Sequence, residues 1–289
     1  MRWEGDRQSD NVEDVRGSGG GGGFGFGGRS VGIGTIVIAL LGSWLFGVSP
    51  TTILNLLSGG GGPVAVQQQP RATPANDEQT QFVRTVLAYT EDTWAEIFRQ
   101  HSATYRNPTL TIFEGATGTA CGTGQSAMGP FYCPADQHVY IDLDFYRTMR
   151  ERFHASGEFA QAYVIAHEVG HHVQNLLGIS DKVHAARERQ FEREANAMSV
   201  RLELQADCFA GVWANRTDQA RRILEQGDVE SALNAASAIG DDALQRQSRG
   251  VVVPDSFTHG SSAQRVRWFT RGIQTGDMEQ CNTFEARQL

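Results

Sequence analysis

The sequence predicts an α+β protein, in which a small β-sheet is followed by a mostly helical body and preceded by one N-terminal transmembrane helix. Three observations support this: an apolar segment follows a glycine-rich start, short strand-like runs lie between Thr109 and Leu143, and helical periodicity dominates from Asp144 onward. The net charge of −8 argues against nucleic acid as a partner, because phosphate binding requires clustered cations.

The first residues differ in composition from the rest of the chain. Of the 33 glycines, 18 lie within residues 1–62, including the run Gly19–Gly23. A polar and glycine-rich stretch cannot bury enough apolar surface to offset the entropy lost on ordering. We therefore expect residues 1–30 to form a flexible tail.

Residues 31–48 form an uncharged apolar segment, VGIGTIVIALLGSWLFGV. As a helix it would be roughly 27 Å long, close to the hydrocarbon thickness of a bilayer. A core helix or the apolar part of a signal peptide are the alternatives, but glycine-rich flanks and the absence of a clear A-x-A site disfavour them. We expect a single-pass membrane anchor here, so that the membrane is one partner.

The charges and the cysteines suggest how this anchor is oriented. Four arginines precede it, and the comparable stretch beyond it has two, which predicts a cytoplasmic tail and an extracytoplasmic (periplasmic) domain. Four cysteines permit two disulfides in an exported domain. Cys121 and Cys133 bracket a short loop that a disulfide could close, which leaves Cys208 and Cys281 to pair.

A linker over residues 49–75 leads to a folded domain over 76–289. The spacing of apolar residues predicts a helix over Phe82–Gln100 behind an Asn76 or Asp77 cap. Strands are predicted at Thr109–Glu114, Phe131–Tyr132 and Val139–Leu143, and a long helix from about Asp181 to Trp213. Val139–Leu143 is either an exposed edge strand, which could pair with an extended peptide, or an ordinary strand.

The stretch HEVGHH, which begins at His167, contains the pattern H-E-x-x-H. On a helix, residues four apart share one face, so His167 and His171 can present two imidazoles to one metal ion. Glu168 lies about 100° around the helix, where it can take a proton from a metal-activated water. Imidazole and carboxylate ligands at an open tetrahedral site favour Zn²⁺.

A catalytic zinc requires a third protein ligand. The best candidate is Glu203, and Asp207 lies four residues later on the same helical face, where it can accept a hydrogen bond from a ligating histidine. His184 and Asp181 compete for the role of third ligand. His172 must point about 100° away from His171 and is not expected to be a ligand.

The motifs HEVGHHVQ, ELQADCFAG and GPFYCPADQHVYIDL together resemble those of the bacterial neutral zinc metallopeptidases, the YpfJ-like family. H-E-x-x-H with a later E-x-x-x-D also resembles the gluzincin metallopeptidases. The resemblance implies a zincin-like fold with one zinc ion bound by His167, His171 and Glu203. It also implies that Glu168 is the general base and that Asp207 supports a ligand.

A further segment, FTHGSSAQRV from Phe257, resembles the T-H-P…R-[IV] segment of integral-membrane gluzincins, with glycine in place of proline. His259 would then donate a hydrogen bond to the oxyanion, with Arg265 nearby. In the alternative interpretation, Ser256 or Thr258 caps a helix and Arg265 pairs with an acid. Tyr163, Tyr140 and Tyr146 are other candidate oxyanion donors.

Taken together, the sequence predicts a membrane-anchored zinc metalloendopeptidase that hydrolyses peptide bonds of a peptide or protein substrate through a zinc-activated water, with Glu168 as base. The alternative is a membrane-tethered binding or assembly protein with a structural or vestigial zinc site. A fourth protein ligand on the zinc would favour that alternative. Zinc hydrolysis of a cell-wall amide is a weaker third possibility.

Overall fold

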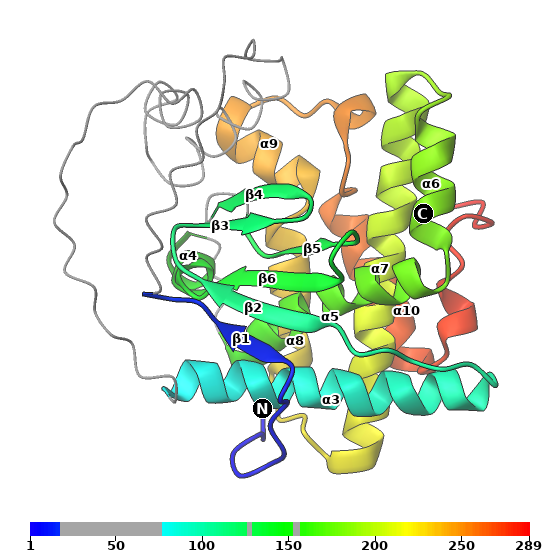
Figure 1. Ribbon diagram of the computed structural model, residues 1–289. Coiled ribbons are helices and arrows are strands. Elements are labelled where there is room, and N and C mark those ends of the chain that lie inside the picture. The colour runs from blue at the N-terminus through cyan, green and yellow to red at the C-terminus, as the bar shows by residue number, and fades with distance from the viewer. Residues whose placement is uncertain (18–76, 126–128, 153–156) are drawn as a thin grey trace, which may run out of the picture.

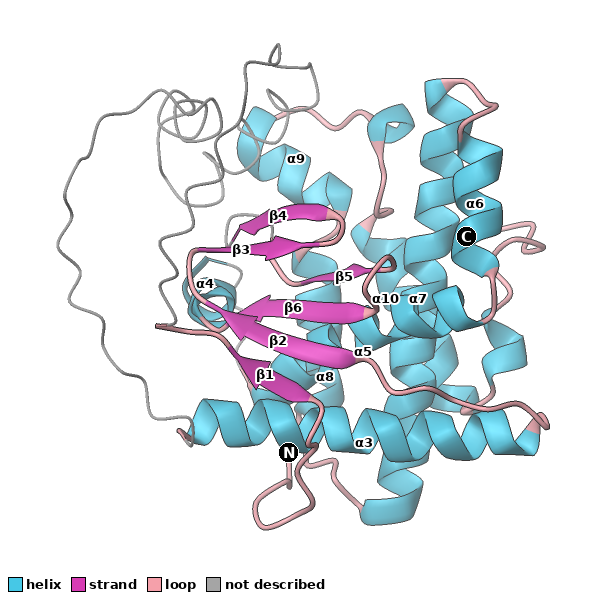
Figure 2. Ribbon diagram, viewed as in Figure 1, coloured by secondary structure: helices cyan, strands magenta, loops and turns pink. Residues whose placement is uncertain are grey.

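The computed structural model describes residues 1–17, 77–125, 129–152 and 157–289. These residues form a mixed α+β structure, with a small sheet on one side of a larger helical body (Figures 1 and 2). The elements are β1 (Val12–Asp14), α3 (Glu78–Gln100), β2 (Thr109–Phe113), β3 (Ala116–Thr119), β4 (Gly122–Gln125), β5 (Phe131–Cys133), β6 (His138–Asp142), α4 (Asp144–Arg152), α5 (Glu158–Leu176), α6 (Ile179–Arg187), α7 (Glu192–Arg221), α8 (Asp228–Ala238), α9 (Asp241–Arg249), the 3-10 helix η2 (Pro254–Ser256), α10 (Ser262–Thr275) and the 3-10 helix η3 (Met278–Cys281).

The main sheet has four strands in the order β1-β2-β6-β5. β1, β2 and β6 are parallel, and β5 is antiparallel to β6. β6 therefore lies inside the sheet, and the interpretation of Val139–Leu143 as an exposed edge strand is wrong. The edge on this side is β5, which lies against α5. A separate hairpin joins β3 to β4.

Residues 1–17 are an ordered part of this domain. β1 pairs with β2, and the indole of Trp3 is buried against Phe82 while its Nε1 donates to Glu158. Arg16 donates to Asp77 at 2.9 Å. The prediction of a flexible tail over residues 1–30 is therefore wrong for residues 1–17.

This pairing also bears on the predicted orientation. Two hydrogen-bonded neighbouring strands must occupy the same compartment, so residues 1–17 and the domain lie on the same side of any membrane. A cytoplasmic tail with an extracytoplasmic domain is not compatible with this arrangement. The rest of the predicted tail, the predicted anchor at 31–48 and the linker at 49–75 lie outside the described residues. Within the described residues, no helix has the length and apolar character needed to cross a bilayer.

Two helix ends follow from local chemistry, whereas one predicted helix is divided in the structure. Asp77 caps α3 by accepting a hydrogen bond from the Thr80 backbone N–H, as expected. Gly178 ends the α5 region with a φ of +68°, a conformation that glycine adopts at little cost. The predicted helix over Asp181–Trp213 is instead divided into α6 and α7, and α7 continues to Arg221.

α5 is the central helix of the domain, and it contacts α3, α7, α8, β5 and β6. Its buried residues join one hydrophobic core with the large side chains of α3 and α7, for example Trp94 and Trp213. α10 crosses α7 closely, since a Cβ atom on Gly272 would overlap the backbone of Cys208. Disulfides Cys121–Cys133 and Cys208–Cys281 are both present, which confirms the predicted pairing.

Candidate metal centre

α5 carries the H-E-x-x-H residues in the interior of the domain. His167 and Glu168 are buried, and the side chain of His171 is 16% exposed. Gly170 on the same helix lies against Ala206 of α7, where even a methyl group would be 3.1 Å from the Ala206 carbonyl oxygen. The absence of a side chain at Gly170 lets α5 and α7 approach closely, and this brings Glu203 of α7 to the two imidazoles.

Within the described part of the chain, one group of three side chains has the arrangement of metal ligands, and it consists of His167, His171 and Glu203. Glu203 Oε2 is 3.2 Å from His167 Nε2, and Glu203 Oε1 is 3.5 Å from His171 Nε2. Two ligand atoms about 2.0 to 2.1 Å from a tetrahedral zinc are separated by roughly 3.3 Å. The spacing of these side chains therefore fits a zinc ion.

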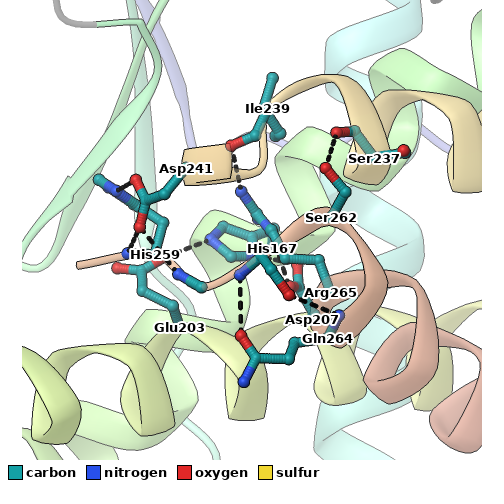
Figure 3. Close-up of polar contacts among 12 residues, drawn as sticks. His167, Glu203, Asp207, Ser237, Ile239, Asp241, His259, Ser262, Gln264 and Arg265 are labelled. Atoms are coloured by element: carbon teal, nitrogen blue, oxygen red, sulfur yellow. Dashed lines mark hydrogen bonds and ion pairs between the residues drawn. The ribbon is translucent and has the colours of Figure 1, made fainter. Parts of the chain in front are cut away.

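Asp207 contacts the outer nitrogen of His167, which is Nδ1, the ring nitrogen that does not face Glu203. Its Oδ1 lies 2.9 Å from His167 Nδ1 and also accepts a hydrogen bond from the Tyr163 hydroxyl. Arg265 of α10 donates to both carboxylate oxygens at 2.9 Å (Figure 3). This arrangement leaves His167 Nε2 directed at Glu203, as the predicted supporting role of Asp207 requires.

The charges of the site are strongly coupled. Burial alone would lower the pKa of His167, but Asp207 and Glu203 outweigh it and raise this pKa to about 10. Burial opposes ionisation of Asp207, yet Arg265 and His167 hold the pKa of this carboxyl at about 2. Burial likewise opposes ionisation of Glu203, but the charges on His171 and His259 hold its pKa well below the usual range. At neutral pH the zinc-free site thus holds ionised carboxylates beside a protonated His167, and zinc binding would require release of the proton on Nε2. Carboxylate and neutral imidazole are then the donor set that zinc binds.

Glu168 differs from the other two carboxylates. Burial raises its pKa above the ordinary value, and the charge on Glu203 adds to this effect, while His167 and His171 oppose it. Glu168 is next to His167 on α5 but is not a member of the ligand group. A carboxylate with a raised pKa beside a metal site is suited to accept and return a proton.

His259 lies in the loop between η2 and α10, beside Asp241. The Asp241 carboxylate accepts hydrogen bonds from the backbone N–H groups of Thr258, His259 and Gly260, and its Oδ1 is 3.3 Å from His259 Nδ1 (Figure 3). Burial would lower the pKa of His259, but the charges of Glu203 and Asp241 raise it. His259 is therefore within electrostatic reach of the ligand group.

The backbone conformation explains why glycine, and not proline, follows His259. Gly260 has a φ of +92°, and proline is fixed near −65°. A Cβ atom at Gly260 would lie 3.2 Å from Leu204 and 3.3 Å from Val200, so this loop rests on α7 beside Glu203.

The structure separates the other candidate residues from the site. His184 is exposed beside Glu188, and Asp181 is exposed on α6, so neither joins the ligand group. His172 donates to the Arg106 carbonyl and accepts from Tyr132, and burial lowers its pKa to about 4. The prediction that His172 is not a ligand agrees with these contacts.

Two of the three candidate tyrosines use their hydroxyls elsewhere, and the third is buried in the core. Tyr140 donates to Asp136 and Tyr163 donates to Asp207, while Tyr146 is part of the hydrophobic core. Arg265 pairs with the buried acid Asp207, as the alternative interpretation of its segment proposed. The cap of α10 is Ser261, not Ser256 or Thr258.

Sequence reasoning did not identify three residues that organise the site, namely Gly170, Gln174 and Asp241. Gln174 accepts a hydrogen bond from His171 Nδ1 at 2.8 Å. It is the last residue of the HEVGHHVQ motif, three positions after His171, so helical spacing could have indicated it. Asp241 precedes His259 by 18 residues, and its role depends on tertiary structure.

An H-E-x-x-H helix joined by a glutamate from a second helix defines a zinc-metallopeptidase type of site. The family model described as "putative neutral zinc metallopeptidase" matches residues 1–284. The chain belongs to this family, as its motifs indicated.

Two relatives match this chain over most of their own length. The chain is 54% identical to "Uncharacterized protein YpfJ" of Escherichia coli (strain K12), over 98% of this chain and 99% of the relative. It is 41% identical to "Uncharacterized protein Rv2575" of Mycobacterium tuberculosis (strain ATCC 25618 / H37Rv), over 73% of this chain and 74% of the relative. No solved structure matches the chain.

Proposed function

We propose that the protein is a zinc-dependent endopeptidase whose single metal ion is bound by His167, His171 and Glu203. The main support is that ligand atoms of all three side chains lie within 4.8 Å of one another, beside the buried carboxylate of Glu168. Three protein ligands leave a fourth position open, which is typical of catalytic zinc and not of structural zinc. This favours an enzyme over the alternative of a binding protein with a structural site.

A bound zinc would supply Lewis-acid polarisation of water and of the substrate carbonyl. Glu168 takes the proton of the attacking water and returns it to the leaving nitrogen. Its raised pKa supports both transfers, since a group with a pKa closer to neutrality exchanges protons more readily. Asp207 holds His167 by its outer nitrogen throughout the reaction.

His259 donates a hydrogen bond to the substrate oxygen that becomes negatively charged. Asp241 supports this role, because it holds the Nδ1 side of the imidazole and fixes the loop through three backbone N–H groups. The raised pKa of His259 favours the protonated ring, which has a donor at each nitrogen.

Membrane association through residues 31–48 is part of this proposal, on the basis of their apolar sequence. This segment would enter and leave the membrane on the same side, since a single crossing would separate β1 from β2. We also propose an extracytoplasmic location for the catalytic domain. The two disulfides support it, because disulfides persist in oxidising compartments. Residues 1–17 would share that location, since β1 belongs to the same sheet.

Glu168→Gln tests the catalytic proposal. This variant should bind zinc as the wild-type protein does and should cleave a peptide library about 10²- to 10⁴-fold more slowly, because it lacks the proton acceptor. Zinc content and cleavage rate are measured on the same preparation. Undiminished, chelator-sensitive cleavage would exclude Glu168 as the base.

A further inference from the structure

The two histidines of the ligand group have different supports for their outer nitrogens. His167 Nδ1 faces the charged carboxylate of Asp207, whereas His171 Nδ1 faces the neutral amide oxygen of Gln174. Gln174 is completely buried on α5. A histidine can bind a metal through Nε2 only when its single ring proton is on Nδ1, so a support for the outer nitrogen also selects the tautomer.

The orientation of the Gln174 amide follows from its other contacts. The terminal amide atom that does not face His171 lies 2.7 Å from the backbone carbonyl oxygen of Leu202 on α7. A carbonyl oxygen can only accept, so the amide NH₂ must face Leu202 and the amide oxygen must face His171. A reversed amide would place two oxygens against each other and would lose the bond to the imidazole N–H.

A second buried glutamine supports the same orientation. Gln174 Nε2 also donates to Gln205 Oε1 at 3.1 Å, and Gln205 Nε2 donates to the Cys281 carbonyl oxygen at 3.1 Å. The Cys281 oxygen accepts and cannot donate, so the Gln205 amide is oriented independently. The disulfide to Cys208 holds Cys281 against α7.

We propose that Gln174 is a positioning residue that fixes the His171 imidazole in the tautomer whose Nε2 binds the metal. The Leu202 carbonyl oxygen in turn fixes the orientation of the Gln174 amide. The inference rests on the proposed metal site. His171 Nδ1 donates to Gln174 Oε1, and the Nε2 lone pair is thereby directed at the side of the ring where Glu203 lies. An interaction of this kind changes metal affinity by about 10- to 100-fold.

Gln174→Met in the full chain tests the proposal, because methionine is of similar size and has no amide. Zinc affinity is measured by competition with a chelator and should fall by about 10- to 100-fold. Thr217→Val is the control, since it removes a buried side-chain hydrogen bond, the one to Thr93, at a position of α7 that belongs neither to the ligand group nor to the contacts of Gln174. It should change zinc affinity by less than about threefold.

A spectroscopic measurement separates positioning from a general loss of stability. In the cobalt(II)-substituted wild-type protein, two exchangeable imidazole N–H resonances are expected, one for each histidine ligand. In Gln174→Met the resonance of His171 should exchange rapidly with solvent, while the resonance of His167, held by Asp207, should persist. Loss of both resonances would indicate general disruption and would overturn the specific role of Gln174.

The outcomes distinguish this inference from the proposed function. If Gln174→Met retains both resonances and binds zinc within about threefold of wild type, Gln174 does not position His171. If the wild-type protein itself fails to bind zinc, the metal site is wrong, and both the proposed function and this inference fail.

Discussion

At the scale of single residues, the site depends on one fully buried carboxylate. Asp207 accepts hydrogen bonds from His167, Tyr163 and Arg265, which come from α5 and α10. Arg265 is almost fully buried as well, so each of the two charges is compensated by the other. A buried pair of this kind contributes little when intact and is costly to break, because the remaining charge is left without a partner.

Asp207→Asn should therefore destabilise the zinc-free domain by about 3 to 5 kcal/mol, since Arg265 would remain buried and unpaired. The measurement is urea unfolding at pH 7 in the presence of a chelator. Asp10→Asn, at an exposed carboxyl, is the matched control and should change stability by less than about 0.5 kcal/mol. Equal stabilities of the two variants would contradict the role given to the pair.

The same carboxyl predicts a pH dependence. The pKa of Asp207 is about 2 in the folded domain and about 3.9 in an unfolded chain. Its ionisation thus contributes about 2 kcal/mol above pH 4, and this stability is lost as the pH falls toward 2. Acid titration of the free energy of unfolding should show this loss in the wild-type protein. The loss should be smaller by that amount in Asp207→Asn.

At the scale of elements, glycines set the distances between the helices that carry the site. Gly170 allows α5 to approach α7, while Gly211 and Gly272 lie where α7 and α10 cross. The candidate ligand Glu203 and the arginine that pairs with Asp207 come from these two crossing helices. The packing of helices and the geometry of the metal site are therefore linked.

Gly272→Ala should destabilise the domain by about 1 to 3 kcal/mol, because the new methyl group would overlap the Cys208 carbonyl and force α10 away from α7. Gly118→Ala provides the control, as a Cβ atom there would have no neighbour within 4 Å. Thermal unfolding of both variants is the measurement. A Gly272→Ala protein as stable as Gly118→Ala would show that the crossing can widen at no cost.

Elements with strong local signals were predictable from the sequence, and those that depend on distant partners were not. The cap at Asp77, the turn at Gly178 and the H-E-x-x-H face follow from local chemistry and helical spacing. β1 has three residues in a polar stretch, so it has no periodicity of its own and exists through pairing with β2. Asp241 likewise could not be predicted, because it contacts His259 only after α9 packs against the loop that contains this histidine.

At the scale of the whole molecule, the first residues complete the domain. Glu91 on α3 accepts hydrogen bonds from Ser9, Asn11 and Arg7, so a buried carboxylate of the body depends on the N-terminal segment. This segment and the helical body therefore form one folding unit, although the predicted anchor lies between them in the sequence.

Labelling of introduced cysteines can test this arrangement, since the four native cysteines form two disulfides. Glu4→Cys and Phe191→Cys place single thiols at exposed positions of the N-terminal segment and the body. A membrane-impermeant maleimide should label both variants alike in intact cells, because both sites are on one side of the membrane. Labelling of one in intact cells and of the other only after lysis would contradict the structure.

The contact between Arg16 and Asp77 means that the chain departs from the domain and re-enters it at nearly the same point. The described residues on either side of 18–76 are therefore held near each other, and a short glycine linker is expected to join residue 17 to residue 77. Closing a shorter loop costs less entropy, by about 2 kcal/mol for such a reduction in length. A trimmed chain of this design would retain the candidate ligands His167, His171 and Glu203 and the N-terminal strand, and it would lack the apolar stretch of residues 31–48.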